Sequence, residues 1–304
     1  MQDHAQFTAQ SPIFVVGSPR SGTTMLAAAL GRHPDIAYYY EPYFIWDYVD
    51  GPGEDDVRTA SDVQAAARDR IIAEFDWFLH KSGKRILVEK TPENSFRIDY
   101  INSIFPNARF IHITRRGHDA ILSLNREWRK RQKLVRTRSY RSLFSVISEN
   151  FVEYPFIRCW FLLIQYELKT RANLRRKHIF NKSKWQGEEG YGPRFPGWRD
   201  TYARNDLLTY NAEQWRHSVE ACVDGLAKLQ EDRVLTIRYE DLTSDTVEVW
   251  AKLQEFAGVS QHPELAPQVL PNRASIERKH AEPGTLEAID RVIEPTLLRL
   301  GYTK

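Results

Sequence analysis

The sequence predicts a single α/β domain in which a parallel β-sheet is flanked by helices. Short, almost continuously apolar segments alternate with helical segments along most of the 304 residues. This pattern is typical of a parallel sheet that is buried on both faces. A glycine-bearing turn joins the first apolar segment to a helix, and the 42% hydrophobic and 27% charged residues are ordinary for a globular protein. We therefore expect residues 1–304 to form one domain.

The first part of the chain is expected to contribute three strands and four helices. The strands are short apolar runs, predicted over residues 12–17, 85–90 and 108–115. The helices have apolar side chains at helical spacing, and they are predicted over residues 21–33, 61–83, 94–105 and 117–133. Ser61 and Gly83 are the expected N-cap and C-cap of the second helix.

Between residues 134 and 211 the alternation breaks. This stretch is basic, aromatic and rich in turn residues, and we interpret it as an insertion on the same domain. Short helices are expected near 144–152 and 156–172, and the turn-rich segment 190–198 is a candidate lid. The elements predicted after it are a strand over 233–242 and helices over 245–257 and 285–299.

Charge and cysteine content narrow the class of protein. Lys and Arg total 43 against 40 Asp and Glu, a net charge of +3, which suits an anionic ligand but is too small to indicate nucleic-acid binding. Cys159 and Cys222 form neither a disulfide framework nor a metal-binding spacing, so no metal is predicted. We find no leader pattern and no apolar run long enough to span a membrane. We expect a soluble, cytoplasmic protein.

The segment GSPRSGTT, residues 17–24, has the glycine spacing of a Walker A loop but lacks its lysine. Gly17 and Gly22 occupy the two glycine positions, and Thr23 stands where the lysine is expected. The turn's N–H groups and the following helix N-terminus still favour an anion, and Arg20 supplies a positive charge. The sequence thus predicts a P-loop-type sheet whose loop is not built for a triphosphate.

The string PIFVVGSPRSGTTML resembles the 5′-phosphosulfate-binding loop of sulfotransferases that use 3′-phosphoadenosine 5′-phosphosulfate (PAPS). It is most similar to the loop of the tyrosylprotein and carbohydrate branch. The resemblance implies PAPS as sulfuryl donor, with no metal. The residues that it implies for binding the 5′-phosphosulfate are Arg20, Ser21, Gly22, Thr23 and Thr24.

A second motif agrees with this resemblance. In FIHITRRGHDAILSL, Arg115 ends a strand and Ser123 follows eight residues later, which is similar to the family's 3′-phosphate-binding signature. A guanidinium donates well to phosphate oxygens, and a hydroxyl from the next helix adds a donor. Towards the C-terminus, the resemblance suggests nucleotide contacts by Tyr239, and by Ser275, Arg278 and Lys279 in the loop before the last helix.

Sulfuryl transfer requires a base and one or two cations. Lys90, in VEKTPEN, resembles the family lysine that contacts the leaving phosphate or the sulfuryl group. The cytosolic small-molecule branch has a catalytic histidine two residues later, but here that residue is Pro92. Glu41, 21 residues after Arg20, corresponds to the general base of the tyrosylprotein branch, and Asp47 is a weaker candidate.

The acceptor must carry a hydroxyl group, and the predicted insertion is expected to shape its site. Basic residues and the aromatics Trp185, Tyr191, Phe195 and Trp198 suit a glycan, including an anionic one, or another hydroxylated metabolite. Sulfation of peptide tyrosine is the alternative acceptor. A nucleotide kinase is opposed by Thr23 and by the lack of a clear acidic magnesium ligand. A non-catalytic nucleotide- or glycan-binding module would be favoured if Glu41 or Lys90 pointed away from the loop.

Overall fold

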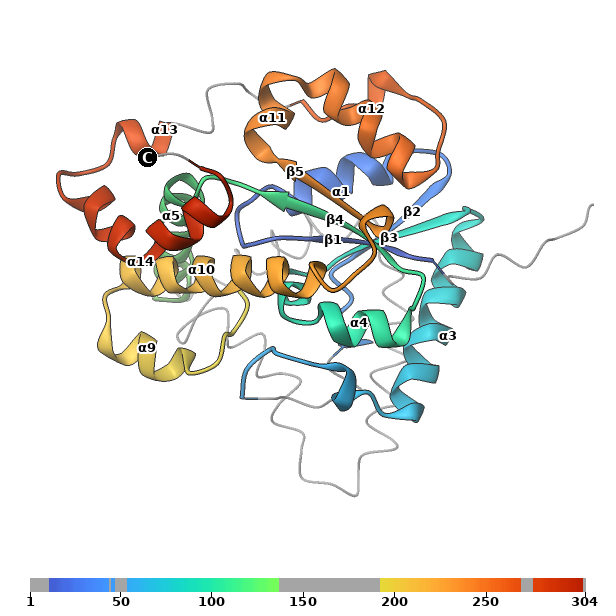
Figure 1. Ribbon diagram of the computed structural model, residues 1–304, viewed down its shortest axis with the longest axis horizontal. Coiled ribbons are helices and arrows are strands. Elements are labelled where there is room, and N and C mark those ends of the chain that lie inside the picture. The colour runs from blue at the N-terminus through green and yellow to red at the C-terminus, as the bar shows by residue number, and fades with distance from the viewer. Residues whose placement is uncertain (1–10, 44, 47–53, 137–191, 269–275, 303–304) are drawn as a thin grey trace, which may run out of the picture. The chain divides into compact units, whose positions relative to one another are not determined.

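A computed structural model (Figure 1) describes residues 11–43, 45–46, 54–136, 192–268 and 276–302. The chain divides into two compact units, and the first joins Met1–Asn125 to Gly192–Lys304. The second, Arg126–Tyr191, is described only over the end of helix α5. The helices expected near 144–152 and 156–172 lie outside the described residues. The role of the insertion in acceptor binding stays a prediction.

The first unit is built on a five-stranded parallel sheet in the order β2-β3-β1-β4-β5. This arrangement confirms the predicted fold class. The strands are β1 Ile13–Val16, β2 Ile36–Tyr40, β3 Ile86–Lys90, β4 Arg109–Thr114 and β5 Val234–Arg238. Because all five run in the same direction, their carboxyl ends meet at one edge of the sheet, where open α/β sheets bind ligands.

Two details of the sheet differ from the sequence-based expectations. Strand β2 was not predicted, because its tyrosine run precedes Glu41-Pro42 and resembles an aromatic loop. It forms because Tyr38 and Tyr40 align with Val88 and Lys90 on β3. The strand predicted over 233–242 ends at Arg238, and the chain turns directly into a helix.

Helices connect the strands and extend the unit. The α-helices are α1 Thr23–Gly31, α3 Ala65–Ser82, α4 Ile98–Ile104, α5 Gly117–Arg136, α9 Trp198–Arg204, α10 Leu207–Leu226, α11 Tyr239–Ser244, α12 Thr246–Ala257, α13 Ile276–Lys279 and α14 Thr285–Arg299. Short 3₁₀-helices are η1 Ala60–Asp62, η2 Pro92–Phe96, η3 Glu231–Arg233 and η4 Pro263–Leu265.

The ends of two predicted helices needed correction. The helix predicted over 61–83 is divided into η1 and α3, so Gln64 rather than Ser61 is its N-cap. Gly83 ends α3 in the left-handed conformation, φ 67°, as predicted. The helix predicted over 94–105 is likewise divided into η2 and α4.

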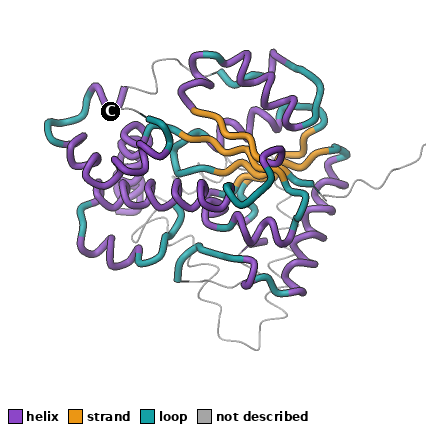
Figure 2. The backbone as a smooth tube through the Cα atoms, in the orientation of Figure 1, coloured by secondary structure: helices purple, strands orange, loops and turns teal. Residues whose placement is uncertain are grey.

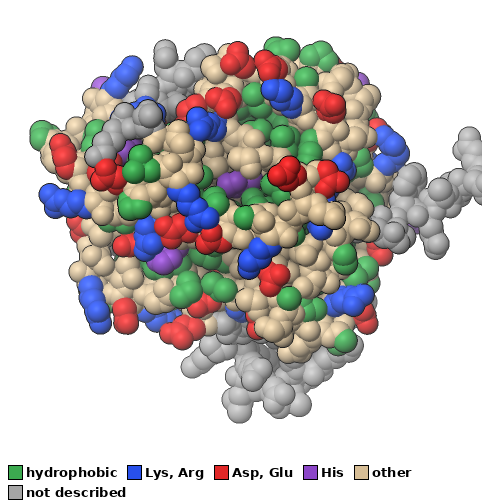
Figure 3. Space-filling view, in the orientation of Figure 1, with side chains coloured by type: hydrophobic (Ala, Val, Ile, Leu, Met, Phe, Trp, Pro, Cys, Tyr) green, Lys and Arg blue, Asp and Glu red, His purple; other side chains and the backbone are tan. Residues whose placement is uncertain are grey.

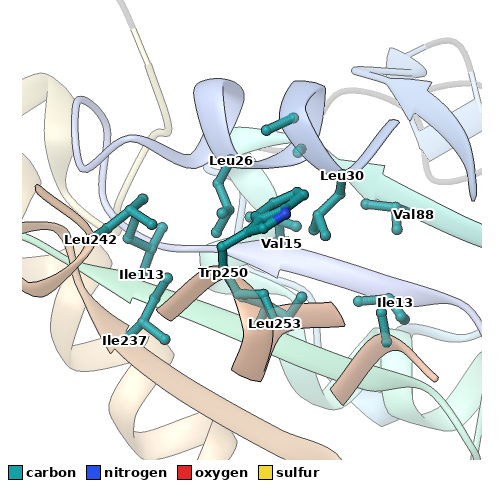
Figure 4. Close-up of a cluster of buried hydrophobic side chains, with 14 of the residues drawn as sticks. Ile13, Val15, Leu26, Leu30, Val88, Ile113, Ile237, Leu242, Trp250 and Leu253 are labelled. Carbon is teal, nitrogen blue, oxygen red and sulfur yellow. The ribbon is translucent and has the colours of Figure 1, made fainter. Parts of the chain in front are cut away.

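One face of the sheet is covered by α1, α11 and α12 (Figures 1 and 2). Trp250 on α12 is 1% exposed and lies among Leu26 and Leu30 of α1 and Val15 of β1 (Figure 4). Val88 on β3 belongs to the same layer, because alternate side chains of a strand face the same side of the sheet. Burial of this aliphatic surface is the main stabilising contribution on this face.

The opposite face carries an aromatic layer. Phe14 of β1 lies between Trp46, Phe75 on α3 and Phe110 on β4, with ring centroids 5.6–6.3 Å apart. Trp46 also contacts Tyr100 on α4. The sheet is therefore buried on both faces, as its apolar strands predict.

Beyond β4, helices α10 and α14 pack together with the first turns of α5. Trp215 on α10 is fully buried among Ala120 and Ile121 of α5 and Ile293 of α14. Figure 3 shows basic and acidic side chains interspersed over the face in view. On the outer side of these helices, Arg299 pairs with Asp224.

Candidate active site

The glycine-rich loop joins β1 to α1 and packs closely against its neighbours. A Cβ atom added to Gly17 would collide with the carbonyl oxygen of Ile113 on β4. One added to Gly22, whose φ is 102°, would lie 2.8 Å from the ring of Tyr239. Glycine is required at both positions, because a side chain would push the loop away from β4 or from Tyr239.

The N-terminus of α1 is suited to an anion. Gly22 is its N-cap residue, no side chain caps the helix, and the first turn contains no acidic residue. The first N–H groups of a helix lack partners within it and carry partial positive charge. The Ser18 hydroxyl in the loop is also buried without a hydrogen-bond partner among the described residues. This set of donors fits a phosphate or sulfate oxygen.

The hydroxyl residues predicted to bind the phosphosulfate differ in exposure. Ser21 is fully buried, and its Oγ donates a hydrogen bond to the carbonyl oxygen of Ser18 at 2.8 Å. This bond holds the loop in shape. Thr23 is buried and Thr24 is exposed. Their contacts with a phosphosulfate stay a prediction.

The two predicted phosphate-binding motifs meet in the structure. The Arg20 Nε donates to the Ser123 Oγ at 3.1 Å, and the Arg115 Nη1 donates to the Arg20 carbonyl oxygen at 2.9 Å. The Arg115 guanidinium lies over the ring of Tyr239, 4.6 Å from its centroid. Arg20, Arg115, Ser123 and Tyr239 therefore form one cluster beside the loop.

The Arg115 side chain is ready to receive an anion. Burial lowers the pKa of its guanidinium from the ordinary value, and its Nε is buried without a hydrogen-bond partner among the described residues. An anion beside Arg115 would satisfy this nitrogen and offset the cost of burying the charge.

Glu41 and Lys90 form an ion pair at the ends of β2 and β3. The Lys90 Nζ lies 2.5 Å from the Glu41 Oε1, and their side chains are 4% and 17% exposed, respectively. The Glu41 backbone N–H donates to the Lys90 carbonyl oxygen at 3.0 Å, and the Tyr43 hydroxyl donates to the Glu41 Oε2 at 3.1 Å. Lys90 comes two residues after Val88, so its side chain leaves β3 on the same face as Val88, the face covered by α1.

Backbone strain is concentrated at this edge of the sheet. Among the described residues, Arg20 and Glu41 are the non-glycine residues with positive φ, at 68° and 41°. Such conformations cost about 1–3 kcal/mol and persist where the surrounding structure imposes them, often at functional sites. The sequence analysis singled out both residues, Arg20 for its charge within the loop and Glu41 through the family resemblance.

The C-terminal candidates have different surroundings. The Arg278 Nε donates to the Asp119 Oδ1 at 2.9 Å, and Asp119 lies one helical turn before Ser123 on α5. Burial raises the pKa of Asp119. Lys279 is exposed, and Ser275 and Asp47 lie outside the described residues.

Glu89 was missed in the sequence. It is fully buried, and its carboxylate accepts hydrogen bonds from the Trp46 Nε1 at 3.2 Å, the Asn94 Nδ2 at 2.7 Å and the Thr91 hydroxyl. Burial raises the pKa of Glu89 to about 7. The signal was an acidic residue inside the apolar run ILVEK, next to Lys90.

Two aromatic residues expected to face a sugar ring are buried instead. Phe195 is 1% exposed and stacks on His217, and Trp198 is 2% exposed and donates to the Glu54 carbonyl oxygen. Trp185 and Tyr191 lie outside the described residues. Phe195 and Trp198 therefore cannot supply a surface for stacking on sugar.

The described part of the candidate lid is anchored to the first unit. Arg194 donates to Asp56 from both its guanidinium and its backbone N–H, each at 2.7 Å. The Gln214 Nε2 donates to the Pro193 carbonyl oxygen at 2.8 Å. These contacts hold residues 192–198 as a strap against the rest of the first unit, and the role of this segment as a lid stays a prediction.

The described residues contain neither a metal-binding cluster nor a membrane-spanning helix. No group of three or more His, Cys, Asp or Glu side chains among them is placed to hold a metal ion. None of the helices in the same residues has the length and apolar character needed to cross a lipid bilayer.

Comparison with known proteins shows what part of this chain is similar to. The model of the sulfotransferase family matches residues 12–151. Nodulation protein NoeE of Sinorhizobium fredii is 34% identical over 131 residues, which are 38% of this chain and 31% of that protein. Protein-tyrosine sulfotransferase 1 of Homo sapiens is 30% identical over 128 residues, which are 37% of this chain and 33% of that protein. The match spans about a third of each relative.

Solved structures extend the likeness of the fold to almost the whole chain. A sulfotransferase domain from the curacin biosynthetic pathway superposes with a TM-score of 0.55, covering 96% of this chain and 98% of that one at 16% identity. Sulfotransferase STF9 from Mycobacterium avium gives a TM-score of 0.51, covering 99% and 80% at 14% identity. At this level of identity the likeness concerns the fold.

Proposed function

We propose that this chain, whose residues 12–151 match the sulfotransferase family model, moves the sulfuryl group of PAPS to an acceptor hydroxyl by in-line displacement. One observation carries the proposal: two motifs more than 90 residues apart, Arg20 and Arg115 with Ser123, meet beside an uncapped helix N-terminus. PAPS, which supplies the sulfuryl group and its phosphate leaving group, carries anionic groups at its 5′ and 3′ positions. The two adjacent cationic sites fit that arrangement.

In this proposal the loop and α1 hold the 5′-phosphosulfate. Arg20 and the N–H groups of Gly22, Thr23 and Thr24 face it, and the Ser21 N–H, which donates to the Ser18 carbonyl oxygen, holds the loop in shape. Arg115 and Ser123 hold the 3′-phosphate, and Tyr239 supports the Arg115 guanidinium. The Arg20–Ser123 hydrogen bond couples the two sites. Arg278 and Lys279 are proposed to add positive charge near the 3′-phosphate.

Glu41 is proposed as the general base and Lys90 as the cation that offsets charge on the leaving oxygen. The Glu41 carboxylate has about four lone-pair sites, and Lys90 and Tyr43 occupy two of them. A remaining site can accept the proton of an acceptor hydroxyl. Positioning and electrostatic stabilisation would supply most of the rate enhancement, by analogy with phosphoryl transfer.

The proposed acceptor is a glycan or another hydroxylated metabolite. Peptide tyrosine is the second candidate, and the similarity to the Homo sapiens protein-tyrosine sulfotransferase favours it. The burial of Phe195 and Trp198 weakens the case for sugar stacking at those residues. Both classes belong in an acceptor screen, with a neutral oligosaccharide and an acidic tyrosine peptide as first probes.

Calorimetric titration with 3′-phosphoadenosine 5′-phosphate (PAP), in parallel with ATP–Mg²⁺, tests the donor. We expect PAP to bind much more tightly than ATP, and Arg115→Ala to weaken PAP binding at least about 10-fold, because it removes a charged phosphate contact. Arg116→Ala is the matched control, since that guanidinium lies over Tyr302 instead. Preference for ATP–Mg²⁺, or equal effects of both variants, would contradict the proposal.

The rate of sulfuryl transfer and the PAP affinity of a Glu41→Gln variant test the role of Glu41 as the base. Glu41→Gln is expected to lower the rate of sulfuryl transfer by about 100-fold or more, with PAP affinity changed less than about 2-fold, because general-base catalysis contributes about this much. A variant that turned over normally would remove Glu41 from the reaction.

A further inference from the structure

Glu89 is a buried carboxylate to which the proposed reaction gives no part. It precedes Lys90 on β3, but successive side chains of a strand face opposite sides of the sheet. Lys90 lies on the face covered by α1, whereas Glu89 enters the aromatic layer and accepts a hydrogen bond from Trp46. The ring of Trp46 contacts Phe14 and Tyr100.

Among the described residues, the donors that bond to Glu89 are neutral. They are the Trp46 indole, the Thr91 hydroxyl and the Asn94 amide. A carboxylate taken out of water without a cation bonded to it is costly for the folded state, and the raised pKa of Glu89 reflects that cost. Stability alone therefore does not account for this residue.

The donors come from the two segments that carry the proposed base and the proposed cation. Glu41 and Trp46, five residues apart, are each bonded to β3. The Glu41 N–H donates to the Lys90 carbonyl oxygen, and the Trp46 indole donates to Glu89. Thr91 and Asn94 belong to the chain that leaves Lys90.

We propose that Glu89 is a positioning residue that sets the geometry of the Glu41–Lys90 pair from the opposite face of the sheet. It holds the segment that carries Glu41 by means of Trp46, and it holds the backbone after Lys90 by means of Thr91 and Asn94. The inference rests on the proposed function, because it takes Glu41 as the group that receives the proton. Small displacements of such a group are expected to lower the rate strongly.

A double-mutant cycle between Glu89→Gln and Glu41→Gln tests this role. The measured quantity is PAP release from saturating PAPS with water as the acceptor, so no unidentified ligand is needed. Glutamine keeps the shape of Glu89 but replaces an accepting oxygen by a donor amide. We expect Glu89→Gln to lower the rate about 10-fold or more, and to lower it less than about 2-fold in the Glu41→Gln background. PAP affinity should change less than about 2-fold in both.

Two further variants separate positioning from loss of fold. Trp46→Phe retains a ring but removes one donor, so it should reproduce part of the rate loss and show the same dependence on Glu41, even if Glu89→Gln fails to fold. Val249 is a buried residue of α12, so Val249→Ala provides a destabilised control. Its rate of PAP release should equal that of the unaltered protein.

The outcomes distinguish the inference from the function on which it rests. Equal rate losses in both backgrounds, with Glu41→Gln strongly impaired, would overturn the role of Glu89 and leave the base intact. Normal turnover by Glu41→Gln would overturn both. A large fall in PAP affinity in Glu89→Gln would mean that Glu89 supports the donor site instead, which also contradicts the proposal.

Discussion

At the scale of single residues, the candidate site combines strained backbone with charged side chains whose partners are other site residues. Arg20 and Glu41 both have positive φ, and each is bonded to another proposed site residue, Ser123 or Lys90. The surrounding hydrogen bonds offset the cost of these conformations. A glycine at either position would relieve strain but remove the charged side chain.

The titration of Glu89 predicts a pH-dependent difference in stability between the unaltered protein and Glu89→Gln. The folded-state pKa is about 7, against 4.5 in the unfolded chain. The folded protein therefore holds this proton more tightly, and the associated stability is complete below about pH 4.5 and lost as the pH rises to about 7. The stability of the unaltered protein relative to Glu89→Gln should fall by up to about 3 kcal/mol across this window.

Urea unfolding of both proteins at pH 4.5, 6 and 8 measures this difference. His112 titrates with the opposite sign, because burial lowers its pKa to about 4, but it is present in both proteins and cancels. If the difference in free energy of unfolding between the two proteins stayed constant or rose with pH, the pKa of Glu89 would not be raised in the folded protein.

At the scale of elements, the loop between β1 and α1 depends on close packing as much as on its sequence. Gly22→Ala places a Cβ 2.8 Å from the Tyr239 ring at a residue with φ 102°. We expect a loss of stability of about 1–3 kcal/mol beyond the ordinary cost of alanine at positive φ. PAP binding should weaken at least about 10-fold, because the loop and the Arg115–Tyr239 pair move together.

Gly258→Ala is the matched control for this variant. Gly258 also has positive φ, 71°, but a Cβ there would meet nothing within 4 Å. It should lose only about 1 kcal/mol and bind PAP normally. Comparable losses of stability and binding in both variants, measured by thermal unfolding and calorimetry, would show that Tyr239 does not restrain the loop.

At the scale of the sheet-containing unit, Asp56 joins segments that are distant in the sequence. Its carboxylate is 1% exposed and pairs with Arg194 at 2.7 Å and Arg97 at 3.6 Å. Asp56→Ala would leave two buried guanidinium groups without their anion, which is expected to cost about 3–5 kcal/mol.

An exposed pair provides the comparison. Asp224 and Arg299 lie on the outer side of α10 and α14, with side chains 61% and 46% exposed, so Asp224→Ala should cost less than about 1 kcal/mol. Chemical denaturation of the two variants measures both values. If Asp56→Ala proved as stable as Asp224→Ala, the strap over residues 192–198 would not depend on this ion pair.

The sequence by itself determined the features that depend on local spacing. Apolar runs and glycine positions predicted four of the five strands, the loop before α1 and most helices, because strand and helix formation follow the periodicity of neighbouring residues. The resemblance of short motifs to the sulfotransferase family identified Arg20, Glu41, Lys90 and Arg115 as candidates. Strand β2 was not predicted, because its tyrosines form a strand only when β3 aligns beside them.

Only the tertiary structure decided which side chains meet. Arg20 and Ser123 are 103 residues apart, and Lys90 and Glu41 are 49 apart, so their contacts depend on strand order and register. The same is true of Glu89, whose donor Trp46 is 43 residues away in the sequence. Phe195 and Trp198 are core residues, and the neighbouring Arg194 pairs with Asp56, 138 residues away in the sequence. Side-chain pairing of this kind is a property of packing, which residue spacing along the chain does not encode.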